Sequence, residues 1–443
     1  MNKNKFTLSV LLTFALWVPT LHAEDLMQIY QLALENDPTY KTAEASLQST
    51  IEAKGIADSK YLPSLDIYGN ASRFKNSNAE SSSTTNTRNY GATVRQSVFN
   101  LNSMVQSRIA KSSIAQAQAQ FAAAREALAI RVSQAYFGVL SALDNLQFSK
   151  AQQEAIGRQL EQTKQRFDVG LVAITDVLES QASFDLSRAD TIAAENQLNN
   201  ARESLRSIIG RYTENLVPLS DKKSFVVRPD PDNIDTWTEM ALDKNYDLLA
   251  SQQAVIQAQE QVSLQRAGYY PTLDLSANYQ KNLAGNYISS NGIPISGDSH
   301  STSIGLNLNV NLYNGGATSS AIAQARQNLI FARETYETNK RGVQQNVHSA
   351  YLGVISNISR VQALKQAVVS NESALKAAEA GFEVGTRTTV DVLNARSQLF
   401  SAINNHSQAR YDYVLGWLNL YQSAGTLDQT TLEKINQWLE VKK

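Results

Sequence analysis

The sequence predicts a mainly α-helical protein that carries a few membrane-type β-strands and consists of two copies of one unit. The stretch 101–169 has no proline, and its apolar and small residues recur at alternating spacings of three and four, as in a coiled coil. The pattern returns 215 residues later, so that Phe167 corresponds to Phe382. In each copy a proline precedes a stretch of period two, which indicates β-strands.

Residues 1–23 have the features of a secretory signal peptide. A basic start with Lys3 and Lys5 is followed by an apolar run to Val18 and a short segment ending at Ala23. The apolar run is shorter than the ~20 residues that a transmembrane helix needs. We therefore expect an exported chain without a helical membrane anchor.

The composition argues against several classes of function. With 40 basic and 41 acidic residues the chain is nearly neutral, which argues against nucleic acid as a partner. It has no cysteine, so it has neither disulfides nor thiol chemistry. His300, His348 and His406 have no cysteine or acidic ligand at metal spacing, and we interpret them as solvated or packed side chains. We find no catalytic constellation, and we predict neither an enzyme nor a metal or cofactor site.

The repeat divides the chain into five segments. In chain order they are the signal peptide 1–23, the first repeat 24–215, an equatorial linker 216–235, the second repeat 236–425 and a C-terminal tail 426–443. In the first repeat, a short amphipathic helix closed by Pro38 and a second helix at about 39–59 precede the strands.

Four stretches are expected to form strands. They lie at about 62–74, 90–99, 271–283 and 303–313. Each is near the 9–11 residues of a membrane-spanning strand. In the last one, Ile304, Leu306 and Leu308 alternate with glycine and asparagine. One apolar face and one polar face suit lipid outside and a wet lumen inside.

A half-buried hairpin of a soluble sheet would show the same alternation. The connections 75–89 and 284–301 favour a membrane sheet, because they are long and rich in Ser, Asn and Gly. Long polar loops at one end of the strands are typical of outer-membrane proteins.

The longest expected helices are at about 101–169 and 316–384. At ~1.5 Å per residue each is about 100 Å long, far more than a globular domain needs. Return helices are expected at about 175–209 and 389–424, and a glycine follows each of them as a C-cap.

The two turns between these helices carry the candidate functional residues. Gly170 and Gly385 follow the long helices, where a left-handed residue is favoured. Asp176 and Asp391 start the return helices, where a carboxylate faces the positive end of the helix dipole. Helix capping accounts for all four residues, but it does not account for Arg387, a cation at a helix start. We expect Arg387 to pair with Asp176 of the other turn.

Three motifs resemble the TolC family of outer-membrane efflux proteins. They are Glu24-Asp25-Leu26-Met27-Gln28-Ile29-Tyr30, Gly170-Leu171-Val172-Ala173-Ile174-Thr175-Asp176-Val177 and Val384-Gly385-Thr386-Arg387-Thr388-Thr389-Val390-Asp391-Val392-Leu393. The resemblance covers essentially the whole mature chain. It implies a homotrimer in which four strands per chain close a 12-stranded outer-membrane β-barrel. The long coiled-coil helices then form an α-helical tunnel in the periplasm, and the linker and tail form a belt around its middle.

The same resemblance implies how the tunnel closes. By motif position, Arg387 bonds Thr175 and Asp176 and so holds the inner end of the tunnel shut. Phe382 stands where the family has a tyrosine that also bonds the first turn's aspartate, so that link is missing here. Asp391 matches a ring of aspartates at the pore-entrance constriction. Asn394 stands where a second ring aspartate is common, so the ring is expected to be less negative.

The function that the resemblance implies is a passive exit duct for drugs, bile salts or secreted proteins. Its partners would be a periplasmic adaptor protein, an inner-membrane efflux pump or ABC transporter, and the lipid of the outer membrane. The residues alone leave one alternative, a trimeric coiled-coil protein that tethers parts of the cell envelope and has no pore.

Overall fold

The computed structural model describes residues 23–77, 82–213, 215–220, 226–284, 287–288, 294–295 and 298–440. All of the predicted signal peptide except Ala23, and parts of both polar strand connections, lie outside the described residues.

The elements follow the chain as two similar series. The first is α1 (Leu26–Asn36), α2 (Pro38–Ser59), β1 (Ser64–Ser77), β2 (Ser82–Asn100), α3 (Leu101–Asp168) and α4 (Ile174–Ile209). The second is α5 (Ile234–Lys244), α6 (Tyr246–Arg266), the 3-10 turn η1 (Ala267–Tyr269), β3 (Thr272–Ala284), β4 (Tyr287–Ile288), β5 (Pro294–Ile295), β6 (Ser299–Asn309), α7 (Ala317–Glu383) and α8 (Thr389–Ser423), followed by α9 (Gln429–Asn436).

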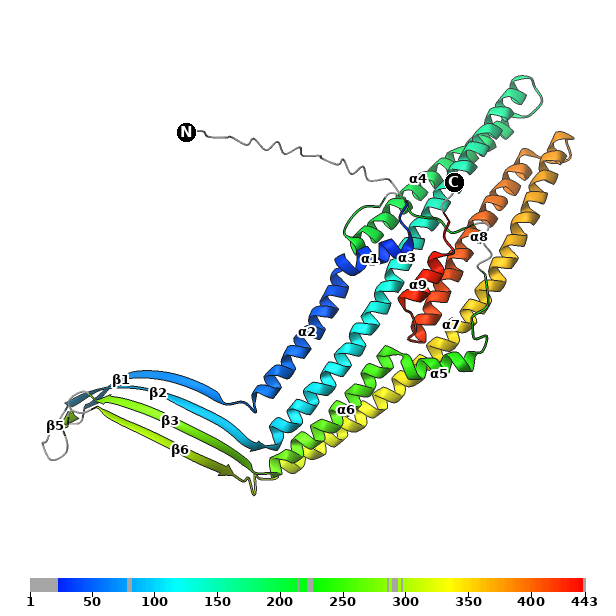
Figure 1. The fold of residues 1–443 in the computed structure, drawn as a ribbon. Helices are drawn as coiled ribbons and strands as arrows, with labels where there is room; N and C mark the ends of the chain where they lie inside the picture. Colours follow the sequence, from blue (N-terminus) through cyan, green and yellow to red (C-terminus); the bar gives the residue numbers. More distant parts are fainter. Residues whose placement is uncertain are drawn as a thin grey trace, which may run out of the picture.

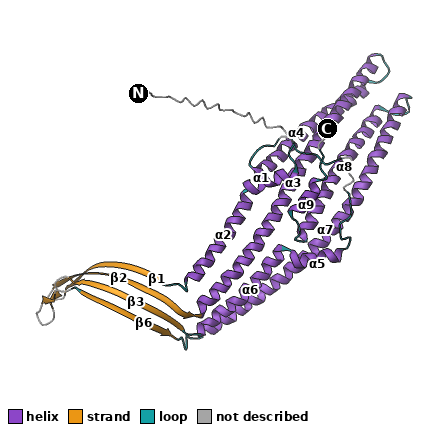
Figure 2. Ribbon diagram, in the orientation of Figure 1, coloured by secondary structure: helices purple, strands orange, loops and turns teal. Residues whose placement is uncertain are grey.

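The helices form a long rod with the curved sheet at one end and the two helical hairpin turns at the other (Figure 1). Figure 2 shows the strands at one end of this rod and the helices along the rest of it. The 68-residue α3 packs against α4, and the 67-residue α7 packs against α8. Asp37, which is 2% exposed, caps α2 and forms a two-point ion pair with Arg131 of α3. In the described part of the chain, no helix combines the length and apolarity needed to cross a bilayer.

The main sheet has the order β1-β2-β3-β6, and all its neighbours are antiparallel. Directly paired residues share a face of the sheet. The face of one residue therefore gives the face of every residue in its cross-strand row. Ile67 pairs with Ala92, Ala92 pairs with Tyr279, and Tyr279 pairs with Thr302. The face of this row also carries the apolar residues Leu65, Val94, Leu273, Leu275, Ala277, Ile304, Leu306 and Leu308. We call it the lipid face; the opposite face is mostly Ser, Thr, Asn and Asp.

Three expected strand limits are wrong by four residues or more. β6 begins at Ser299, whereas the expected strand began near residue 303. β2 begins at Ser82, whereas the expected strand began near residue 90. Residues 82–89 are polar and have no apolar alternation, but their backbone pairs with β1 from Ser77 onward. The last strand ends at Asn309 and not at 313. Asn309 pairs with Thr272, and Pro271 just before it has no amide hydrogen with which to extend the ladder.

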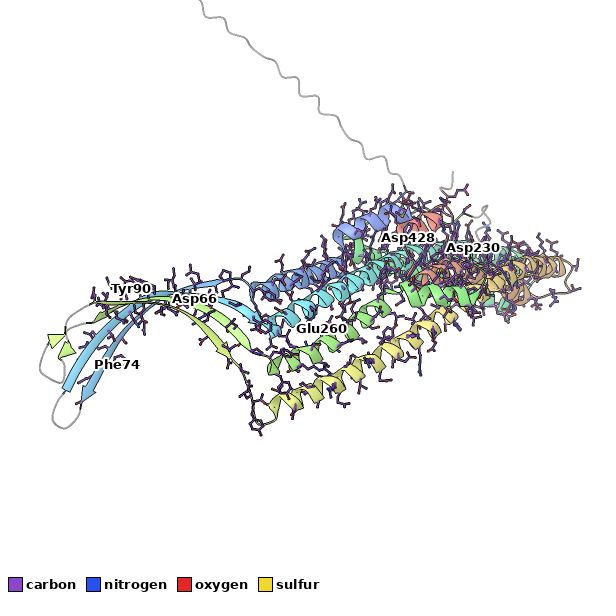
Figure 3. All side chains as sticks on the ribbon, turned by 60° about the horizontal axis from the view of Figure 1, so that its bottom comes forward. Asp66, Phe74, Tyr90, Asp230, Glu260 and Asp428 are labelled. Atoms are coloured by element: carbon purple, nitrogen blue, oxygen red, sulfur yellow. The ribbon has the colours of Figure 1, made fainter. Side chains whose placement is uncertain are left out.

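The linker and tail pack together against the middle of the rod, where Asp230 and Asp428 lie (Figure 3). Leu219 and Leu439 form an antiparallel bridge, and Glu24 bridges Leu216. The buried Tyr136 of α3 donates a 2.7 Å hydrogen bond to the Val217 carbonyl. Three segments far apart in the sequence therefore meet at one level of the rod.

Candidate functional site

The first hairpin tip is a tight turn between α3 and α4. Gly170 has φ +76°, a left-handed conformation that glycine adopts without strain. Its amide donates to the Phe167 carbonyl at 2.8 Å. At the start of α4, the Asp176 carboxylate accepts from the Ala173 amide at 3.3 Å. Ala173 has no side-chain acceptor to return, so this cap is only half of a capping box.

The second hairpin tip is more fully bonded. Gly385 has φ +77°, and the amides of Thr386 and Arg387 both donate to the Gly381 carbonyl, at 2.8 and 3.2 Å. Thr388 and Asp391 form a complete capping box, because each side chain accepts from the other residue's amide, at 2.8 and 3.2 Å. Both turns therefore owe their shape to a left-handed glycine and a helix-start aspartate.

The hydrogen bonds to Asp391 also affect its charge. The Thr388 amide and then the Thr388 hydroxyl hold the pKa of Asp391 below its ordinary value. The carboxylate is therefore anionic throughout the physiological range. Asn394 is exposed and lies three residues further along α8, on the same side of the helix.

Within this protomer, Arg387 lies beside Asp391. Its guanidinium nitrogen is 3.8 Å from the Asp391 carboxylate, and 60% of the arginine side chain is exposed. A Cβ on Gly381 would lie 2.7 Å from the Arg387 Cγ, so the glycine makes room for the arginine stem. The ion pairs of the described residues do not join Arg387 to Asp176, and Thr175 is exposed at the start of α4.

Phe382 contacts the first hairpin in a way that the sequence analysis did not foresee. The guanidinium carbon of Arg166 lies 4.8 Å from the centre of the Phe382 ring, a cation–π contact between α3 and α7. Both side chains are half-buried. Arg166 and Gly381 occupy equivalent positions of the two repeats. At this position the first repeat has an arginine that contacts Phe382 of α7. The second repeat has a glycine, which leaves space for the Arg387 side chain.

Arg396 is a second contact between the hairpins that was missed. It projects from α8, donates to the Ala155 carbonyl of α3 at 2.9 Å and pairs with Glu379 of α7 at 2.6 Å. Its side chain is 15% exposed. A signal was available, because Arg396 follows the buried Val392 by four residues and so lies on the apolar stripe of α8.

Comparison with known proteins shows the family of this chain. The family model described as outer membrane efflux protein matches residues 29–211 and 237–426. The chain is 39% identical to the outer membrane protein TolC of Vibrio cholerae serotype O1, over 98% of this chain and 96% of that protein. It is 29% identical to the alkaline protease secretion protein AprF of Pseudomonas aeruginosa, over 93% and 86% of the two chains.

A solved structure agrees with the fold. The crystal structure of CusC superposes with a TM-score of 0.77 at 16% identity, over 91% of this chain and 93% of that chain. The two family matches coincide with the two repeats, and the relatives span nearly the full length. The chain therefore belongs to the outer membrane efflux protein family, whose members are outer-membrane proteins that extend into the periplasm.

Proposed function

We propose that this chain is one protomer of a trimeric exit duct, gated at its hairpin tips. The observation that carries the proposal is an open four-stranded sheet with one apolar face, attached to helices of 68 and 67 residues. An open sheet in lipid leaves unpaired backbone groups at β1 and β6, each costing several kcal/mol. The smallest membrane barrels have eight strands, so several chains are needed to close one.

Three chains are the number that the family resemblance supports. Twelve strands would then present the lipid face outward and the polar face to a wet lumen. Three sets of α3, α4, α7 and α8 would continue that lumen as a tunnel. The cargo would be drugs, bile salts or secreted proteins, delivered by a periplasmic adaptor with an inner-membrane pump or ABC transporter. The name of the relative AprF supports secretion, and the family name supports efflux.

Mass and conductance of the purified protein test this proposal. We expect a membrane-extracted particle with the mass of three chains, which conducts ions after insertion into planar bilayers. A particle with the mass of one chain would contradict the barrel. A trimer that never conducts would instead favour a tether without a pore.

For the gate, we propose that Arg387 bonds Thr175 and Asp176 of an adjacent protomer. The Arg387 side chain is 60% exposed, and its ion pair among the described residues is the 3.8 Å contact with its own Asp391. One oxygen of the Asp176 carboxylate accepts a hydrogen bond from the Ala173 amide, and the carboxylate can accept further hydrogen bonds. We call these bonds between protomers the latch. Arg166 on Phe382, and Arg396, would hold the two hairpins of each protomer together.

The charge at the constriction gives a separate prediction. Three copies of the anionic Asp391 around one axis should favour cations, as acidic rings do in other pores. Asp391→Asn removes the charge but keeps an acceptor for the Thr388 amide, so α8 stays capped. We expect its reversal potential under a salt gradient to shift toward zero. Glu372→Gln, at an exposed position of α7 outside the hairpin turns, is the control. An equal shift there would show that Asp391 has no special position.

A further inference from the structure

Cations collect on the outer part of the lipid face. The register places Ala71 opposite Arg88, Tyr90 opposite Lys281, and Lys281 opposite His300. Arg73 and Lys75 follow Ala71 at intervals of two, so they share this face. Arg73, Lys75, Arg88 and His300 are exposed. We call Arg73, Lys75, Arg88, Lys281 and His300 the basic band.

The basic band lies directly beyond an apolar belt and a pair of tyrosines. Ile67 and Ile304, 81% and 75% exposed, belong to the apolar part nearer the helices. Tyr90 and Tyr279 come next along the strands and are each about half exposed. The order apolar, tyrosine, cation is that of a surface passing from the hydrocarbon of a bilayer through its interface to the headgroups. Figure 3 shows Tyr90 on the outer part of the sheet, away from the helices.

The charges on the two faces differ. Among the described strand residues, the polar face mixes Arg95 with Asp66 and Asp274. Among the described residues, Asp298 is acidic and lies 3.6 Å from Lys281 of the basic band. Asp298 offsets the charge of Lys281, and no ion pair of the described residues involves Arg73, Lys75 or Arg88. Because Arg73 pairs with Asn86, it is a diagonal neighbour of Arg88, at roughly 7–8 Å between Cα atoms.

We propose that the basic band binds phosphate groups of lipids in the outer leaflet of the outer membrane. The inference rests on the proposed barrel, since only a barrel gives this face to lipid. The helices extend to the opposite side of the membrane, so the strand ends that carry the basic band lie in the outer leaflet (Figure 1). An arginine fork binds a phosphate through two parallel hydrogen bonds. Tyr90 and Tyr279 would support the sugar or glycerol part of the same headgroup.

The test compares two lipids on the intact, detergent-purified protein. The probe is lipid A with both phosphates, and its control is the same acylated disaccharide with the phosphates removed. Each surface cation contributes about fivefold in affinity for an anionic lipid, so three contribute about a hundredfold. We expect wild type to bind the phosphorylated lipid about a hundredfold more tightly. Equal binding of the two lipids would overturn the proposal.

Variants locate the site. The triple change Arg73→Gln, Lys75→Gln, Arg88→Gln should abolish the preference for phosphate. Two controls should keep it. The first is Arg95→Gln, on the opposite face of β2, and the second is the triple change Arg326→Gln, Arg333→Gln, Lys340→Gln, at two exposed positions and one half-buried position of α7. An unchanged preference in the first triple variant would overturn the assignment. If that variant does not reach the membrane, the comparison of the two lipids on wild type still decides.

Two further measurements separate the alternatives. Millimolar inorganic phosphate should not displace the phosphorylated lipid, and displacement would show a site for free anions instead. The first triple variant should conduct like wild type in planar bilayers, because the basic band faces away from the lumen. Normal conductance without phosphate preference therefore supports the duct and the lipid site together, whereas a wild type that conducts and shows no preference refutes only the lipid site.

Discussion

Arg387→Ser trimers are expected to conduct severalfold more current in planar bilayers than wild-type trimers do. A single exposed ion pair contributes only ~0–1 kcal/mol, and the Arg387 side chain is 60% exposed. In the proposed trimer, threefold symmetry would multiply that contribution, and the proposed hydrogen bonds to Thr175 would add to it. A closed state favoured by a few kcal/mol leaves the open state at about the percent level or below. Loss of the latch should raise that fraction markedly.

The fold itself should not change in this variant. Among the described residues, the exposed Arg387 side chain packs over Gly381 and beside Asp391, so trimer yield and melting temperature should stay close to wild type. Arg341→Ser is the matched control, since Arg341 is an exposed arginine of α7 that pairs with Glu337 at i,i+4. Unchanged conductance in intact Arg387→Ser trimers would rule out the latch. Arg166 on Phe382, and Arg396 on Ala155, would then be the contacts that keep the tips together.

Glu126→Gln is expected to stabilise the protein at alkaline pH. Glu126 of α3 is 7% exposed, and its carboxyl oxygen accepts from the Leu427 amide at 3.0 Å. Burial raises its pKa to about 8; the Leu427 hydrogen bond opposes this rise, and the Asp247 charge adds to it. The folded protein therefore keeps Glu126 protonated at neutral pH.

The sign of the pH effect follows from proton binding. An unfolded glutamate has a pKa near 4.5, so between pH 4.5 and 8 the folded state binds the extra proton. The contribution of Glu126 to the free energy of unfolding is thus fully present below pH 4.5. It falls as the pH rises to about 8. At pH 7 the loss is on the order of 3 kcal/mol. Glutamine keeps the acceptor for Leu427 and does not titrate.

Unfolding of detergent-solubilised trimers at several pH values measures this effect. The stability difference between Glu126→Gln and wild type should be near zero at pH 4.5 and largest at pH 8. Glu372→Gln, an exposed position of α7, serves as the control and should follow wild type at every pH. If Glu126→Gln also follows wild type, the prediction is wrong. Ionisation of Glu126 in the folded protein then does not lower the free energy of unfolding.

The sequence predicted the fold class because its two periods are local properties of the chain. A seam of alternating three and four residues locates α3 and α7 within a residue or two of their ends. The start of β2 was missed because residues 82–89 have no apolar alternation and are held by the backbone ladder with β1. That ladder involves no side-chain pattern that a sequence could display.

The candidate site was predicted less completely, for a different reason. The glycines and aspartates of the turns act within a few residues, so their caps could be read from the chain. Arg166 and Phe382, and likewise Arg396 and Ala155, are more than 200 residues apart and meet only through tertiary packing. The 3.8 Å contact from Arg387 to Asp391 is local and has i,i+4 spacing, so this pair could also have been predicted from the chain.

Three distant segments meet at the middle of the rod, so this part of the protomer can fold only when the C-terminal segment is present. The Asn436 side chain accepts from the Leu26 amide and donates to Asp25, each at 3.1 Å, and the Ser220 amide donates to the Trp438 carbonyl at 3.0 Å. Asp25 and Leu26 thus form these bonds only after residues about four hundred positions later have been synthesised. A chain that ends before Asn436 cannot form these hydrogen bonds. We therefore expect such a chain to be excluded from the trimer and to be cleaved readily by proteases.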